Sequence, residues 1–139
     1  MTSADFKSRL ESTLSKCGLE WKESEHYLKG VLDVGSGRTQ AFLVDTNVDH
    51  FGPYQDHDIL SPVCRVADQS ERIKAVAVAL LEFSGKQKVG HVAVINGILV
   101  CKADCSVDAP DEAFETLLRT ICKMADTLEK ILTEGLDAY

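Results

Sequence analysis

An Asn-Gly pair between two apolar runs constrains the fold of this chain more than any other feature of the sequence. Asn96-Gly97 is flanked by residues 91–95 and 98–103, most of which are apolar. A two-residue type I′ turn needs a positive φ at both central positions, and Asn-Gly adopts this turn readily. The sequence therefore predicts a β-hairpin. Its cross-strand pairs are Ile95 with Ile98, Val94 with Leu99, Ala93 with Val100, Val92 with Cys101 and His91 with Lys102.

Both faces of this predicted hairpin are apolar near the turn. One face carries Val92, Val94, Leu99, Cys101 and Ala103, and the other carries Ala93, Ile95, Ile98 and Val100. Apolar sheet faces are normally covered, so at least one of the two needs a cover from elsewhere. The cover is either the chain's own helices or the surface of a second protein.

The composition is that of a single globular domain. The chain has 139 residues, of which 45% are hydrophobic and 27% are charged, and a chain of this size can bury a core. There are 15 Lys and Arg residues against 22 Asp and Glu residues, which gives a net charge of −7. No basic cluster stands out, which argues against a nucleic-acid partner.

The N-terminal sequence does not resemble a targeting signal. Residues 1–5 have neither the basic region nor the apolar region of a signal peptide, and no stretch approaches the roughly 18 apolar residues of a membrane span. We therefore expect a cytoplasmic protein with no membrane contact.

Hydrophobic periodicity predicts one α+β domain over residues 1–139. The expected order is α-β-β-β-α-β-β-α, with helices at 3–17, 68–83 and 110–134 and strands at 19–34, 39–45, 59–66 and in the hairpin. Strands in meander groups favour an antiparallel sheet of about five strands packed against three helices. A bulge or bend is expected near Gly30.

The second predicted helix is apolar around most of its circumference. Ile73, Val76, Ala77, Leu80 and Leu81 share one face, and Val78 and Ala79 extend it. A helix of this kind is buried on more than one side. Packing against a second copy of the chain would provide the second side.

Two groups of residues could bind a metal ion. Asp49, His50, His57 and Asp58 concentrate carboxylates and imidazoles in one segment, although a polar loop that turns at Gly52-Pro53 is the simpler interpretation. Cys101 and Cys105 have a Cys-x3-Cys spacing, but four residues of a strand span about 13 Å, too far for a shared ion. We favour a chain without a cofactor, with its five cysteines as reduced thiols.

No catalytic motif is visible in the sequence. The segment from Gly35 to Arg38 contains Gly-x-Gly, but it lacks the third glycine of a dinucleotide site and the Gly-Lys-Ser/Thr of a Walker loop. A tight turn between strands is the simpler interpretation. We therefore expect that the protein is not an enzyme.

The sequence resembles a known group of proteins. The resemblance rests on the order of elements and on three diffuse hydrophobic patterns. These are Ile59-Leu60-Ser61-Pro62-Val63, the run Gly90-x-Val92-Ala93-Val94-x-Asn96-Gly97-x-Leu99-Val100, and Phe114-x-x-Leu117-Leu118 followed by Ala125-Asp126. They are similar to those of the YbjN family and of the related class I type III secretion chaperones of the Tir-chaperone type. Ser84 stands where we expect Asn in YbjN-like proteins.

The resemblance implies a cytoplasmic, usually dimeric protein that binds another polypeptide without catalysis. Our leading hypothesis is a chaperone-like, protein-binding homodimer. Its expected contact residues are Val76, Leu80, Ile95, Ile98 and Val100. A YbjN-like regulatory domain that binds a folded partner, and a metal-binding protein or enzyme that uses the 49–58 segment, are the alternatives.

Overall fold

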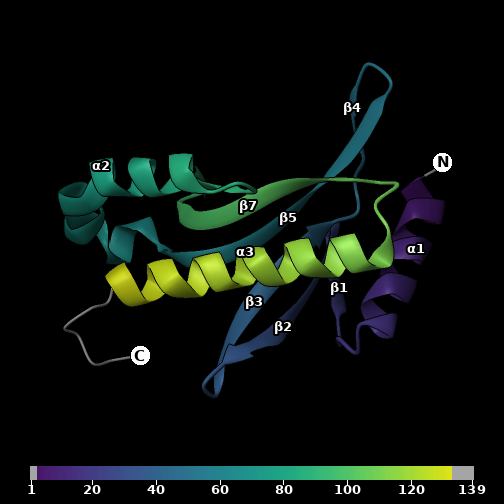
Figure 1. Cartoon of the computed structure of the whole chain (residues 1–139), viewed down its shortest axis with the longest axis horizontal. Helices are drawn as coiled ribbons and strands as arrows, with labels where there is room; N and C mark the ends of the chain where they lie inside the picture. Colours follow the sequence, from purple (N-terminus) through teal and green to yellow (C-terminus); the bar gives the residue numbers. More distant parts are fainter. Residues whose placement is uncertain (1–2, 133–139) are drawn as a thin grey trace.

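The structure, a computed structural model, describes residues 3–132 and has a sheet with helices packed along it (Figure 1). The elements, in chain order, are α1 (Ser3–Lys16), β1 (Lys22–Ser24), β2 (Tyr27–Gly35), β3 (Arg38–Asp45), β4 (Asp49–Phe51), β5 (Tyr54–Arg65), the 3-10 turn η1 (Val66–Asp68), α2 (Ser70–Lys86), β6 (His91–Ile95), β7 (Ile98–Ser106) and α3 (Asp111–Leu132). The predicted end of the last helix, at 133–134, lies outside the described residues.

The predicted Asn-Gly hairpin is confirmed. Asn96 and Gly97 have φ values of 50° and 76°, as a type I′ turn requires. The strands β6 and β7 pair in the predicted register, from Ile95 with Ile98 to His91 with Lys102.

The α+β fold is also confirmed, with more strands than the sequence predicted. In the described part of the chain, one antiparallel sheet of seven strands has the order β1-β2-β3-β5-β7-β6, and β4 pairs with β5. The region 19–34, expected as one strand, is two, because the chain reverses at Glu25, where φ is 54°. The polar 49–58 segment is largely a second hairpin, in which β4 pairs with β5 around Gly52-Pro53.

One face of the sheet carries the core. The long helix α3 packs across β2, β3, β5 and β7, and the strand residues beneath it are buried at every second position. These include Leu28, Leu32, Phe42, Val44, Ile59, Ser61, Leu99, Cys101 and Ala103. Along α3 one side is buried from Phe114 to Leu132, since residues three and four apart share one helix face.

The helix α1 is fastened to the start of α3. Its narrow apolar stripe, Phe6, Leu10 and Leu14, is buried. The Arg9 guanidinium donates to the carbonyls of Val107 and Ala109, before α3 begins. These bonds hold α1 against the segment that joins β7 to α3.

The helix α2 is the least buried of the three. It contacts β6 and η1, and Leu80 is its one buried residue. The expectation that α2 is buried on more than one side is therefore not met within the single chain. No helix in the described residues is long and apolar enough to cross a membrane.

Candidate protein-binding surfaces

The five residues predicted to contact a partner do not form one exposed patch. Leu80 and Val100 are buried, Val76 and Ile95 are half-buried, and Ile98 is 37% exposed. Val76 and Leu80 face inward because α2 uses this side to pack on the domain. Their role in partner binding stays a prediction.

The opposite side of α2 is apolar and open to solvent. Val78 and Leu81 are 70% and 74% exposed, and they lie three residues apart on one helix face. The sequence pattern signalled this face, since α2 is apolar around most of its circumference. We call Val78 and Leu81 the α2 outer face.

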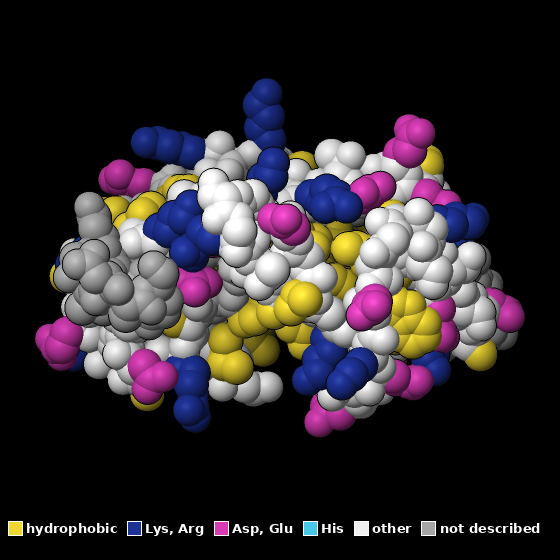
Figure 2. All heavy atoms as spheres, turned by 90° about the horizontal axis from the view of Figure 1, so that it is seen from below, with side chains coloured by type: hydrophobic (Ala, Val, Ile, Leu, Met, Phe, Trp, Pro, Cys, Tyr) yellow, Lys and Arg dark blue, Asp and Glu magenta, His cyan; other side chains and the backbone are white. Residues whose placement is uncertain are grey.

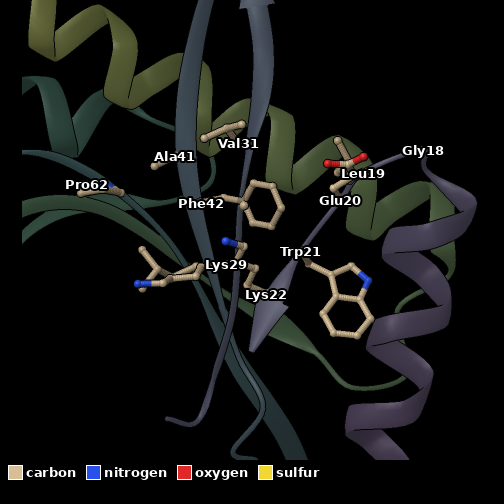
Figure 3. Close-up of a pocket in the computed structure, with 12 residues that line it drawn as sticks. Gly18, Leu19, Glu20, Trp21, Lys22, Lys29, Val31, Ala41, Phe42 and Pro62 are labelled. Atoms are coloured by element: carbon tan, nitrogen blue, oxygen red, sulfur yellow. The ribbon is translucent and has the colours of Figure 1, made fainter. Parts of the chain in front are cut away.

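A groove of about 790 Å³ lies beside β2 and β3 (Figure 3). Its lining is Gly18, Leu19, Glu20, Trp21, Lys22, Lys29, Gly30, Val31, Ala41, Phe42, Leu43 and Pro62. In Figure 3, Trp21 lies on the α1 side, Phe42 and Val31 lie near the middle, and Ala41 and Pro62 lie on the far side. We call this hollow the β2 groove. Its walls are mainly apolar, as is usual for a binding site.

The position of Gly30 explains how the groove forms. A Cβ at this residue would lie 2.4 Å from the Glu20 carbonyl oxygen and 2.8 Å from Cζ of Phe42. Only glycine leaves room for the link after α1 to cross here before entering β1. The link thus forms one wall of the groove, with Trp21 in it.

A second hollow, of about 430 Å³, flanks the other end of β2. It is lined by Leu32, Asp33, Val34, Gly35, Arg119 and Lys123. Arg119 forms an ion pair of 2.9 Å with Glu115, whereas Lys123 is exposed and no ion pair to it is found in the described residues. Figure 2 shows the molecule from below. Hydrophobic side chains gather in the middle of the face seen in this view, with Lys and Arg side chains beside them.

The predicted metal ligands are not brought together. His57 is buried between Phe6, with ring centroids 4.7 Å apart, and Phe114, at 6.0 Å. Asp58, the next residue on the strand, points to the opposite sheet face, and Asp49 and His50 lie exposed on β4. Among the described residues, no three His, Cys, Asp or Glu side chains form a group that could hold a metal ion.

Burial decides the chemistry of the imidazole and the core thiols. It lowers the pKa of His57 to about 4, although a hydrogen bond to the backbone of Asp45 acts in the opposite direction. It also raises the pKa of Cys101 and Cys122 to about 12 and that of Cys105 to about 11. At neutral pH these groups are an uncharged ring and three protonated thiols, which are poor nucleophiles.

Facing carboxylates occupy the sheet face away from α3. Asp58 and Asp104 are directly opposite on β5 and β7. The hydrogen bond that protonated Asp104 donates to the Asp58 carboxylate, together with burial, raises the pKa of Asp104. Lys102 reaches Asp58 at 3.4 Å. This lysine balances part of the negative charge, so the cluster is explained as a cross-strand ion pair with an extra carboxyl group.

Sequence reasoning missed the β2 groove. Trp21 packs partly against the core, and it also lines the groove. No motif could have indicated this, because the groove depends on the reversal at Glu25 and on the close crossing at Gly30.

Comparisons with known proteins give no further assignment. No family model matches the chain, and no curated protein is significantly similar to it.

Proposed function

We propose that the protein is a non-enzymatic, chaperone-like module that acts as a homodimer and binds a partner polypeptide. The observation that carries this proposal is the presence of two open apolar surfaces, the α2 outer face and the β2 groove, on one small domain. Large exposed apolar side chains on a monomer cost solvation free energy, and they mark surfaces that bind other proteins.

The α2 outer face suits a symmetric contact between two copies. An exposed helix face pairs with itself across a two-fold axis, because the same residues then meet from both sides. Val78 and Leu81 of two copies would interlock and remove both from water. Each fully buried Val or Leu side chain contributes about 1.5–3 kcal/mol.

Light scattering during size-exclusion chromatography tests the dimer. We expect a mass near twice 15.2 kDa, and we expect Leu81→Asp to give a monomer, since it would bury an unpaired carboxylate at the contact. Val31→Asp is the matched control, because Val31 is 60% exposed but lies on β2. A monomeric wild-type protein would contradict the homodimer, and a dimer that survives Leu81→Asp would place the contact elsewhere.

A pull-down with the Val31→Asp protein tests partner binding separately. Val31 lines the β2 groove, so this variant should remain dimeric and lose the partner retained by the wild-type protein. Equal retention by both proteins would show that the groove is not the binding site.

A further inference from the structure

The strand β2 has a partner along only part of one edge. The pairing of β1 with β2 ends at Lys22 and Lys29, whereas β2 continues to Gly35. In the described structure, residues 31–35 therefore have a neighbouring strand only on the β3 side. This free edge is about 16 Å long at 3.3 Å per residue.

The backbone groups along this edge point outward at the odd-numbered positions. Thr46 N–H donates to the His26 carbonyl at 2.8 Å, in the register that pairs Tyr27 with Asp45. Even-numbered residues of β2 thus direct their N–H and C=O groups to β3, and odd-numbered ones direct theirs away. Val31 and Asp33 present these groups at the free edge, which is a template for an added strand.

The two sides of the free edge differ in chemistry. On the face away from α3, Val31 lies opposite Ala41, and both belong to the apolar β2 groove. On the α3 side, the second hollow has Arg119 and Lys123 in its wall. Successive side chains of a strand point to opposite faces. A strand beside Val31 would thus place one set of side chains on apolar surface and the alternate set near cationic groups.

A pair of lysines adds positive charge at the inner end of the edge, on the same sheet face as Val31. Lys22 and Lys29 are directly opposite on β1 and β2, both are exposed, and no ion pair with a described residue neutralises either of them. Like charges in this position destabilise a sheet. The two hollows are lined by four cationic side chains, of which Arg119 is paired with Glu115, and by two acidic ones, Glu20 and Asp33, although the whole chain carries a net charge of −7.

We propose that the free edge of β2 adds a strand from the partner polypeptide, and that this segment alternates apolar with acidic side chains. Main-chain hydrogen bonds to Val31 and Asp33 supply affinity, and the alternation matches the apolar and cationic sides. This inference rests on the proposed function, and it names the chemistry of the partner segment.

Trp21 makes the inference measurable. It is the single tryptophan of the chain and lines the groove (Figure 3), so its fluorescence reports occupancy there. The probes are three synthetic peptides: one alternates valine with aspartate, the second replaces each aspartate with lysine, and the third is the aspartate peptide N-methylated at its valines. We expect a saturable fluorescence change with the first peptide and binding weaker by about tenfold or more with the others.

Two lysine variants provide the matched control. Lys123→Glu should weaken binding of the aspartate peptide by about tenfold and reduce its dependence on salt. Lys86→Glu changes the net charge equally, but Lys86 lies at the end of α2, so binding should be unchanged. Equal binding of the aspartate and lysine peptides, or no effect of Lys123→Glu, would overturn the proposed charge preference.

The remaining outcomes separate this inference from the proposed function. A wild-type dimer that retains a partner but shows no fluorescence change with any peptide would overturn strand addition and leave the protein-binding function standing. Loss of the dimer on Val31→Pro, which removes an outward N–H, would show that the edge pairs with a second copy and would overturn a partner strand there.

Discussion

Arg38 at the start of β3 donates a hydrogen bond of 2.7 Å from Nε to Oδ1 of Asp126 on α3. The Asp126 side chain is buried, and Lys130 reaches its other oxygen at 3.3 Å. This contact fixes the end of the β2–β3 hairpin against the long helix. A buried carboxylate with two cationic partners is costly to disrupt one partner at a time.

Replacing Arg38 is therefore expected to destabilise the fold. Arg38→Met leaves the Asp126 carboxylate buried with only the half-exposed Lys130, and we expect the free energy of unfolding to fall by about 2–3 kcal/mol. Urea denaturation gives this value. The matched control is Lys74→Met, which removes an exposed ion pair of 3.9 Å with Glu71 and should change the free energy by less than about 0.5 kcal/mol. Equal effects of the two variants would show that the Arg38 contact is not stabilising.

The buried His57 predicts a loss of stability in mild acid. Its pKa lies at about 4 in the folded protein, against 6.5 as the ordinary value, so the unfolded chain binds the proton first as the pH falls. This contribution to stability is complete above pH 6.5 and is lost between pH 6.5 and about 4. The difference between these two pKa values corresponds to a decrease of about 3 kcal/mol at most in the free energy of unfolding.

Urea denaturation at several pH values isolates this contribution. His57→Leu should remove a large part of the decrease in unfolding free energy between pH 6.5 and 4, whereas the exposed His50→Leu should leave the decrease as it is. The raised pKa values of Asp45 and Glu129 act on all three proteins alike, so the comparison cancels them. If the unfolding free energies of the wild type and of His57→Leu fell in parallel with pH, the loss of stability in acid would not come from His57.

The cysteines should divide into two reactivity classes. Cys101, Cys105 and Cys122 are buried, while Cys17 and Cys64 are half-buried, and a thiol reacts only as an accessible thiolate. A thiol reagent should therefore modify at most two cysteines of the native protein rapidly and all five in urea. Mass spectrometry of the modified protein measures this, and rapid native labelling of Cys101 would mean that the sheet under α3 opens readily.

The sequence predicts best those parts of the fold that are determined by residues close together in the chain. The hairpin at Asn96-Gly97 was predicted in register because the turn residues and the alternation act within a few positions. The reversal at Glu25 was missed because glutamate rarely adopts a positive φ. The β4–β5 hairpin was read as a loop because its polar residues conceal the alternation.

The candidate surfaces were predictable to a smaller extent. The apolar circumference of α2 predicted burial on more than one side. It could not show that Leu80 faces the core and Leu81 the solvent, because that depends on how α2 docks beside β6. The β2 groove required both the reversal at Glu25 and the close crossing at Gly30, and hydrophobic periodicity encodes neither.

The crossing at Gly30 can be tested by adding one methyl group. Gly30→Ala places a Cβ within 2.4 Å of the Glu20 carbonyl oxygen, and this backbone atom cannot move without shifting the link that carries Trp21. We expect a loss of about 1–3 kcal/mol in the free energy of unfolding, as for other overpacked sites, together with a change in Trp21 fluorescence. Gly85→Ala is the matched control, since a Cβ there meets nothing within 4 Å and alanine favours the helix by about 0.5–1 kcal/mol. Opposite signs for the two substitutions would identify the close approach at Gly30 as the cause. A Gly30→Ala protein as stable as the wild type, with unchanged Trp21 fluorescence, would mean that the link does not cross β2 at this point and that the groove lacks its wall.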